Sequence, residues 1–336
     1  NIRRSYAMKV FSHITWDRII MDECHYIKNK KSLRSRSARC LKGAIKWGLT
    51  GTPVQNSIDD LITLFTFIQP DDWDEQKYPI KKHTVKFYKH KLMLRRTHAN
   101  CPVDSHHPLQ ISTITEKVVR FPFSTPEERK LYATTIDYID AKIKETMEDE
   151  SESNIGKFQC MLELLVRARQ LSIHPKVYLE GIKRRAARLN TEYVPYSSEE
   201  DDYDYSRLSS RYETVLQYIE QEPQTNQLLF CRYTIEMDLW EEILTERGIR
   251  CCKYNGSTSM SKRETIINSF TTDTPGGVLL IQIMAGGVGL NLQQFTRVFL
   301  TTPDWNPSNE IQAIARSYRI GQLVPVELFR FIIEDP

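Results

Sequence analysis

The chain has 336 residues, of which 40% are hydrophobic and 26% are charged. This composition is sufficient for two domains with their own cores, and it excludes a disordered or fibrous protein. The net charge of +3 is too small to indicate nucleic acid by itself. No run approaches the roughly 18 apolar residues of a membrane span, and the first residues lack a signal-peptide core. The seven cysteines show no ligand spacing for zinc, which favours reduced thiols in the cytosol or nucleus.

Two adjacent carboxylates follow the first apolar segment. Ile19-Ile20-Met21 predicts a buried strand, and Asp22-Glu23 comes directly after it. Open α/β sheets keep their chemistry at the carboxyl ends of the strands. One carboxylate there could hold Mg²⁺, and its neighbour could take a proton from an attacking water. An exposed acidic turn is the simpler interpretation of an isolated pair, so the residues downstream must decide.

A turn one strand further on bears on that choice. Residues 44–49 predict a short strand, which Thr50-Gly51-Thr52-Pro53 follows. Gly51 provides backbone freedom, and the threonine hydroxyls can hydrogen-bond a neighbouring loop or the acidic pair. Alone, this is an ordinary strand-to-helix turn.

Basic and helical segments come next. Residues 26–46 and 81–96 are basic and flank a helix predicted over 58–67. Such charge usually marks a solvated helix face, with phosphate contact as the alternative. The pattern then predicts a strand over 118–123, and helices from Pro126 to about 144 and over 158–171.

The segment 193–210 is acidic and rich in tyrosine, with a near-continuous carboxylate block from Glu199 to Asp204. We interpret it as a flexible surface linker and the best domain boundary. His174 precedes Pro175, where the helix is expected to stop. No partner His or Cys lies near His174, so packing or capping is expected of it rather than metal binding.

The last third alternates strands with helices of about ten residues, which indicates a parallel, doubly wound sheet. The predicted strands are 227–231, 251–254, 278–283 and 297–300, and the predicted helices are 211–221, 235–247, 262–269 and 309–319.

Three features of this region could contact phosphate. Asn255-Gly256-Ser257-Thr258-Ser259 opens a helix, although a plain capping turn is an equal alternative. Residues 285–292 place three glycines after a strand, a weak signal by itself. Arg316 and Arg319 are three residues apart on a predicted helix, so they would share one face and offer two cations to one anion.

The order of these motifs resembles that of the Swi/Snf family of superfamily-two, helicase-like ATPases, from about Trp16 to Phe331. The motifs are Asp-Glu-Cys-His (22–25), Leu-Thr-Gly-Thr-Pro-Val-Gln-Asn (49–56), Leu-Arg-Arg-Thr (94–97), Arg-Gln-Leu-Ser-Ile-His-Pro (169–175), Asn-Gly-Ser-Thr-Ser (255–259), Ala-Gly-Gly-Val-Gly-Leu-Asn-Leu (285–292), Asp-Trp-Asn-Pro (304–307) and Tyr-Arg-Ile-Gly-Gln (318–322). The chain looks most like the DNA-repair and transcription branch that often carries a RING finger between its lobes, and here that finger is absent.

The resemblance implies an α/β fold of two RecA-like parallel-sheet lobes, the first one incomplete, with helical insertions between them. The expected divisions are residues 1–124 for the C-terminal part of lobe 1, 125–205 for a helical protrusion and acidic linker, and 206–336 for lobe 2.

The resemblance also implies residue roles. Asp22 would hold Mg²⁺ and Glu23 would polarise water, while Arg316 and Arg319 would reach the γ-phosphate of ATP as catalytic cations. The other residues implied at the ATP site and its coupling to the second lobe are His25, Thr50, Gly51, Thr52, Gly287, Gly289 and Gln312. Ser257, Thr258 and Trp305 would contact the DNA backbone or minor groove.

The sequence also departs from the family pattern. A phosphate cradle of the form G-x-x-x-x-G-K-[ST] is missing, since the one Gly-Lys pair, Gly156-Lys157, is followed by Phe158 and has Ser151 where the first glycine should be. The chain is therefore expected to begin partway through its first lobe. Ala315 replaces an acidic residue before Arg316, which favours Arg319 as the phosphate-contacting cation.

The leading hypothesis is a nuclear, DNA-dependent ATPase that tracks along duplex DNA and remodels nucleosomes or other protein–DNA complexes, with ATP and Mg²⁺ as cofactors and no membrane association. These residues alone are expected to hydrolyse little ATP. The alternative from another class is a non-hydrolysing DNA- or chromatin-binding scaffold, and a strand-separating helicase is a weaker possibility.

Overall fold

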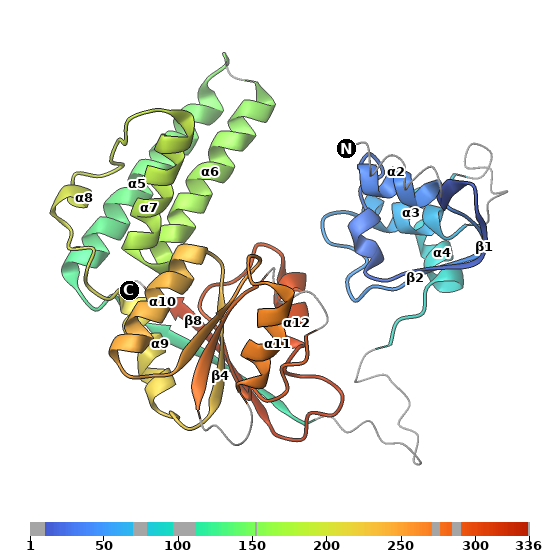
Figure 1. Cartoon of the computed structure of the whole chain (residues 1–336). Coiled ribbons are helices and arrows are strands. Elements are labelled where there is room, and N and C mark those ends of the chain that lie inside the picture. Colours follow the sequence, from blue (N-terminus) through green and yellow to red (C-terminus); the bar gives the residue numbers. More distant parts are fainter. Residues whose placement is uncertain are drawn as a thin grey trace. The chain divides into compact units, whose positions relative to one another are not determined.

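The computed structural model describes residues 11–69, 79–96, 112–151, 153–270, 276–283 and 290–334. The chain divides into two units, Asn1–Pro108 and Leu109–Pro336, which are taken separately below (Figure 1). None of the described helices is both long and apolar enough to span a bilayer. The described cysteines are all free thiols.

The first unit is built on a pair of parallel strands, β1 (Thr15–Met21) and β2 (Lys42–Gly48). Its helical elements are η1 (Cys24–Ile27), α2 (Leu33–Arg39), α3 (Ile58–Phe67) and α4 (Val85–Leu92). Serine hydroxyls cap two of the helices: Ser32 accepts from Ser35 N, and Ser57 accepts from Asp59 N. Both predicted strands and the helix predicted over 58–67 are confirmed.

Among the described residues of this unit, one face of the strand pair is covered and the other is exposed. Ile19 is buried in a small core with Leu64 and Phe67 of α3. On the strands' exposed positions, Ile20 is 65% exposed and Trp47 is 59% exposed. The prediction of a fully buried strand was therefore wrong for Ile20. A parallel sheet normally has both faces covered, so the described unit has the form of part of a larger lobe.

The second unit contains a sheet in which every pairing between the described strands is parallel, in the order β3-β8-β7-β4-β6-β5. The strands are β3 (Ile114–Phe121), β4 (Asn226–Cys231), β5 (Cys251–Tyr254), β6 (Gly277–Gln282), β7 (Arg297–Leu300) and β8 (Val326–Ile333). The predicted parallel sheet is confirmed, and β8 is an additional strand that the sequence pattern did not reveal.

Strand β3 belongs to this second sheet. It pairs with β8 along its whole length, from Ile114 opposite Val326 to Phe121 opposite Ile333. The division between the two units accordingly falls after Pro108, before the position 124 expected for the end of the first lobe. Alternation of apolar residues predicts a strand but carries no information about its partner.

Two apolar clusters cover the two faces of the second sheet. Strand β4 alternates between them, with Leu229 and Cys231 in one cluster and Leu228 and Phe230 in the other. The first cluster also contains residues of α9 (Ser210–Glu220) and α10 (Thr234–Glu246), and the second contains residues of α12 (Pro307–Ile314), with α11 (Met260–Asn268) packed against it.

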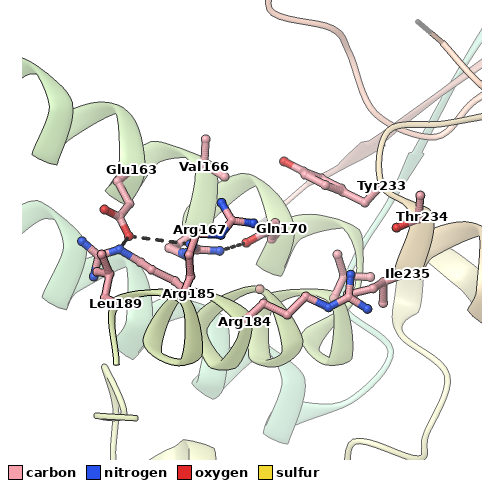
Figure 2. Close-up of a pocket in the computed structure, with 13 residues that line it drawn as sticks. Glu163, Val166, Arg167, Gln170, Arg184, Arg185, Leu189, Tyr233, Thr234 and Ile235 are labelled. Carbon is pink, nitrogen blue, oxygen red and sulfur yellow. Dashed lines mark hydrogen bonds and ion pairs between the residues drawn. The ribbon is translucent and has the colours of Figure 1, made fainter. Parts of the chain in front are cut away.

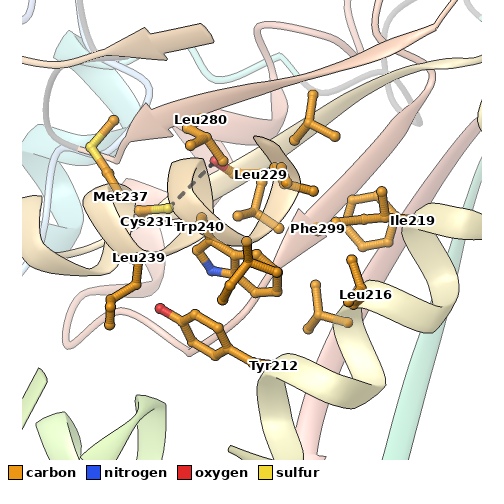
Figure 3. Packing of buried hydrophobic residues seen from close by; sticks show 14 of the residues in the cluster. Tyr212, Leu216, Ile219, Leu229, Cys231, Met237, Leu239, Trp240, Leu280 and Phe299 are labelled. Carbon is orange, nitrogen blue, oxygen red and sulfur yellow. Dashed lines mark hydrogen bonds between the residues drawn. The ribbon is translucent and has the colours of Figure 1, made fainter. Parts of the chain in front are cut away.

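The ring of Trp240 is the largest fully buried side chain of this unit and lies in the first cluster. It stacks on Tyr212 of α9 with ring centroids 4.1 Å apart (Figure 3). Aromatic pairs of this kind contribute beyond the area they bury, so we regard this contact as the main link between α9 and α10.

A set of helices connects β3 to α9. They are α5 (Pro126–Glu148), α6 (Asn154–Ile173), α7 (Pro175–Leu189) and the short α8 (Glu199–Asp202). The predicted helices within α5 and α6 are confirmed, but α7 was missed, because Pro175 was interpreted as a stop. Proline is equally suited to the first turn of a new helix.

His174 joins α6 to α7 as a capping residue, as predicted. Its Nδ1 accepts a hydrogen bond from the Lys176 amide at 3.0 Å. Burial lowers the pKa of His174 to about 4, so the imidazole is neutral at pH 7.

The acidic segment is anchored rather than a solvated linker, which corrects its interpretation. Glu200 is 3% exposed and accepts hydrogen bonds from the Tyr178 hydroxyl at 2.6 Å and the Tyr196 amide at 2.7 Å, as well as from the Tyr193 hydroxyl. The neighbouring Asp201 and Asp202 are exposed. One buried carboxylate thus holds the segment on α7, a distinction that charge composition cannot make.

Candidate nucleotide and DNA sites

The turn after β1 has an unusual backbone. Glu23 has φ 49°, in the left-handed region that non-glycine residues rarely occupy. The Cys24 amide donates to Leu49 O at 2.9 Å, and the Leu49 amide donates to Met21 O at 2.9 Å. A Cβ on Gly48 would lie 2.9 Å from Cys24 Sγ, so the glycine makes room for the buried thiol. These contacts hold the turn at the carboxyl ends of both strands.

The two carboxylates of this turn lie in different surroundings. Asp22 is exposed, and its Oδ1 accepts the Glu23 amide at 2.9 Å. Glu23 Oε2 lies 3.2 Å from Nδ1 of His25, a buried residue. The same His25 Nδ1 is 3.0 Å from the Thr50 hydroxyl oxygen. His25 therefore connects the acidic pair to the threonine turn. Of the two partners that the sequence allowed for the threonine hydroxyls, the neighbouring loop is the one that Thr50 contacts.

The charge of His25 matters for this link. Burial lowers its pKa, and the nearby Lys28 acts in the same direction, against the opposing effect of Glu23. His25 is accordingly neutral at pH 7.

The threonine turn is held by a chain of hydrogen bonds. The Thr52 amide donates to the Thr50 hydroxyl at 3.1 Å, and Gln55 Nε2 donates to the Thr52 hydroxyl at 3.2 Å. Asp60 Oδ2 accepts from the amides of Gln55 at 3.1 Å and Asn56 at 2.9 Å. Sequence reasoning did not single out Asp60, although an acid in the first turn of α3 is the expected partner for free amides.

Gly51 has no steric reason within this unit to be glycine. Its φ lies outside the left-handed region, and a Cβ added there would meet no described atom within 4 Å. The open space beside Gly51 is what the approach of another group to this backbone would require.

The acidic turn fits Mg²⁺ as nucleotide sites hold it. Among the described residues no three His, Cys, Asp or Glu side chains converge as a complete protein cage. Mg²⁺ commonly takes one or two carboxylates and completes its shell with water and phosphate oxygens. The exposed carboxylate of Asp22 meets that requirement.

In the second unit, the turn around Ser257 and Thr258 is shaped by Asn255. Asn255 Oδ1 accepts from the Ser257 amide at 3.0 Å and from the Ser257 hydroxyl at 2.7 Å, while Thr258 Oγ1 accepts the Asn255 amide at 3.0 Å. The turn is thus ordered by its own hydrogen bonds, and Gly256 and Ser257 face solvent.

The exposed Trp305 follows a buried acid, Asp304, whose contacts fix the backbone beside it. The Asp304 side chain is 1% exposed and pairs with Arg232 at 2.5 Å. It also accepts from Asn309 Nδ2 at 2.9 Å. Trp305 is 55% exposed, and the Arg169 guanidinium carbon lies 5.4 Å from its ring. The structure thus joins the 304–307 motif to the 169–175 motif, which sequence spacing could not show.

The interpretation of Arg316 and Arg319 as neighbours on one helix face was wrong. Helix α12 ends at Ile314, and both arginines lie in the turns that follow. Gln322 organises this loop, because its buried Nε2 donates to Gln293 O at 2.8 Å and to Ser317 O at 3.1 Å. Arg319 is exposed, Arg316 is half-buried, and Gln312 lies on α12.

The structure thus brings together Asp22, Glu23, His25, Thr50 and Thr52 in the first unit. The arginines, Gln312, Ser257, Thr258 and Trp305 lie in the second unit. Gly287 and Gly289 fall outside the described residues.

The sequence matches two known protein domains. The SNF2-related domain matches residues 3–177, more than half of the chain, and the helicase conserved C-terminal domain matches residues 210–321. The chain belongs to the SNF2-related family, and the resemblance to Swi/Snf proteins is confirmed.

Individual relatives are distant. The human SWI/SNF-related matrix-associated actin-dependent regulator of chromatin subfamily A member 1 is 26% identical over 343 residues, which cover 97% of this chain and 30% of that protein. The probable global transactivator of Orgyia pseudotsugata multicapsid polyhedrosis virus is 28% identical over 333 residues, covering 95% of this chain and 62% of that protein. The chain therefore spans about a third to two thirds of the length of these two relatives.

A solved structure supports the fold. The crystal structure of the C-terminal part of the Fun30 ATPase domain matches with a TM-score of 0.51 and 18% identity, over 67% of this chain and 87% of that one. Together with the family matches and the parallel sheets, it confirms the predicted α/β fold with RecA-like lobes.

Proposed function

We propose that these residues form the greater part of a DNA-dependent ATPase of Swi/Snf type, which translocates along duplex DNA and remodels protein–DNA complexes in the nucleus. The observation that carries the proposal is the contact of His25 with both Glu23 and Thr50, at the carboxyl ends of β1 and β2. In a chain of the SNF2-related family, this contact connects the acidic pair to the Thr50-Gly51-Thr52 turn, which is expected to couple the state of ATP to the second lobe.

The residues of the first unit have separable tasks. Bound Mg²⁺–ATP supplies the phosphate electrophile and its charge neutralisation. Asp22 would hold the metal through its exposed carboxylate, and Glu23 would take the proton of the attacking water. Neutral His25 lies against both Glu23 and the Thr50 hydroxyl, so it holds the acidic pair and the threonine turn in a fixed arrangement.

The second unit supplies cations and DNA contacts. Arg319, with Arg316, is proposed to stabilise charge on the transferred phosphoryl group. Trp305, beside Arg169, and the Ser257-Thr258 turn are proposed to contact duplex DNA. Binding of this kind goes mainly to phosphates, so it should be tolerant of sequence and should weaken as salt rises. Nucleosomes are the proposed remodelling target.

ATP turnover with and without duplex DNA tests the proposal. Residues 1–336 carry no G-x-x-x-x-G-K-[ST] motif, and we expect them to hydrolyse little or no ATP alone. A version joined to a phosphate-binding first-lobe segment should show DNA-stimulated turnover. Robust DNA-stimulated hydrolysis by residues 1–336 alone would contradict the assigned dependence on that segment.

DNA binding is tested separately, by fluorescence anisotropy with a labelled duplex. Trp305→Ala should weaken binding, whereas Trp47→Ala should not, although the two rings are similarly exposed at 55% and 59%. Equal effects of the two substitutions would remove Trp305 from the proposed DNA surface.

A scaffold that binds DNA without hydrolysing ATP is the second candidate, favoured by the absence of a phosphate cradle from residues 1–336. It predicts that the version with a phosphate-binding segment still binds duplex DNA but shows no turnover. DNA-stimulated turnover in that version excludes it.

A further inference from the structure

A cavity of about 590 Å³ lies within the second unit, between α6, α7 and the start of α10 (Figure 2). Its walls carry four arginines, Arg167, Arg184, Arg185 and Arg188, against a single acid, Glu163. Val166, Leu189 and Ile235 supply apolar surface, and Tyr233 and Thr234 close one side. None of these residues belongs to the ATP or DNA sites proposed above.

The charges on the walls are only partly compensated. Glu163 pairs with Arg185 and lies 3.6 Å from Nη2 of Arg167. In the part of the chain that the structure describes, the guanidinium groups of Arg184 and Arg188 form no hydrogen bond or ion pair, and both residues are exposed. The cavity thus keeps a surplus of positive charge that faces solvent.

Arg167 contributes a buried, positively charged hydrogen-bond donor to the wall of this cavity. Its side chain is 10% exposed, and Nη1 donates to Gln170 Oε1 at 2.6 Å. Its Nε is buried and has no hydrogen-bond partner among the described residues. Leaving a charged donor buried and unsatisfied is costly, so an acceptor that enters the cavity would relieve that cost.

Gly181, in the middle of α7, leaves room for the Arg167 guanidinium at the cavity wall. A Cβ there would lie 2.6 Å from Arg167 Nη1 and 2.7 Å from Gln170 Nε2. Glycine inside a helix costs about 1 kcal/mol relative to alanine. Here it lets the buried guanidinium of α6 lie directly against the backbone of α7, at the wall of the cavity.

We propose that this cavity binds a compact polyanion with several phosphate groups. The volume falls in the range of small-molecule pockets, roughly 300–1,000 Å³. Arginine is suited to phosphate because its planar donors can bind two oxygens at once. Several cations lining one open cavity favour a multiply charged ligand over a single carboxylate.

The test uses inorganic tripolyphosphate as the probe, titrated calorimetrically into the chain of residues 1–336. The double variant R184A/R188A should bind about a hundredfold more weakly, since each lost charged contact corresponds to about tenfold, or about 1.4 kcal/mol. Both residues are exposed, so the variant should keep its fold, which circular dichroism checks.

Lys183→Ala is the matched control. It removes one exposed cation from the same helix but does not line the cavity, so tripolyphosphate affinity should stay within about twofold of the unchanged chain. If R184A/R188A binds tripolyphosphate as well as the unchanged chain does, or Lys183→Ala weakens binding as much as the double variant, the proposal is overturned.

Three further arms separate the possible sources of the anion. Orthophosphate should bind much more weakly than tripolyphosphate, because it engages fewer arginines. Gly181→Ala should weaken tripolyphosphate binding by displacing Arg167. Duplex DNA should bind equally to the unchanged chain and to R184A/R188A. If the double variant instead loses DNA affinity and keeps tripolyphosphate affinity, the arginines serve the nucleic acid and the proposal fails, whatever the outcome for ATP turnover.

Discussion

Both units contain parallel strands, but the central strands of the second unit are buried on both faces, whereas the described strands of the first unit are buried on one face only. In the second unit, β4 is buried on both faces, and its residues Leu228, Leu229 and Phe230 are almost fully shielded from solvent. In the first unit, Ile19 is buried but Ile20 is 65% exposed. The acidic pair and the threonine turn lie in the first unit, whereas Arg316, Arg319 and Gln312 lie in the second. Strand burial and chemical content are thus separate properties of this chain, and each can be tested by itself.

The largest expected effect concerns stability. Trp240→Ala should lower the free energy of unfolding of the second unit by about 3–5 kcal/mol, because the cavity left behind cannot close around the stacked Tyr212 ring. Ile20→Ala should change the stability of the first unit by no more than about 0.5 kcal/mol. Urea titration followed by circular dichroism measures both. A large loss for Ile20→Ala would show that its strand face is covered.

Substitution in the first unit should instead affect ATP turnover more than stability. In a version with a phosphate-binding segment, Glu23→Gln should lower DNA-stimulated ATP turnover by about a hundredfold or more, because the amide cannot accept the proton from water. Its stability should be unchanged. Asp17→Asn, on β1 and exposed, is the charge-matched control and should retain turnover. Unchanged turnover in Glu23→Gln would exclude it as the base.

Acid should weaken the second unit through His174. Burial depresses its folded pKa to about 4, below the usual value of 6.5, so the unfolded chain takes up the proton first. The stabilisation is present above about pH 6.5 and is lost as the pH falls towards 4. The loss amounts to about 2 kcal/mol between pH 8 and pH 5.

His174→Asn isolates this effect, since asparagine can still cap α7 but does not titrate. Urea midpoints at pH 8 and pH 5 should differ less for the variant than for the unchanged chain. An equal pH dependence in both would assign the acid sensitivity to other groups.

The smallest effect compares two glycines of the first unit. Gly48→Ala should cost about 1 kcal/mol, because the new methyl group would lie 2.9 Å from Cys24 Sγ. Gly51→Ala meets no described atom within 4 Å and should leave the melting temperature nearly unchanged. Equal destabilisation by both would show that the space beside Gly51 is filled in solution.

Much of the candidate site could be predicted from neighbouring residues alone. The Asp22-Glu23 pair after an apolar strand and the Thr50 turn after the next strand are local patterns, and the structure places both at the carboxyl ends of β1 and β2. Their link through His25 was not foreseeable, because the two residues in contact are 25 positions apart. The prediction that Arg316 and Arg319 share a helix face was wrong, because helix periodicity does not show where a helix ends.

The amino-acid sequence by itself determined the family, the order of most strands and helices, the acidic and threonine turns, and the capping role of His174, because these depend on local chemistry and short spacing. Only the tertiary structure decided that β3 pairs with β8, that Glu200 is buried by tyrosines, and that four arginines and Gly181 line one cavity. Those features depend on contacts between residues far apart in the chain, and such contacts form only when the helices and strands pack.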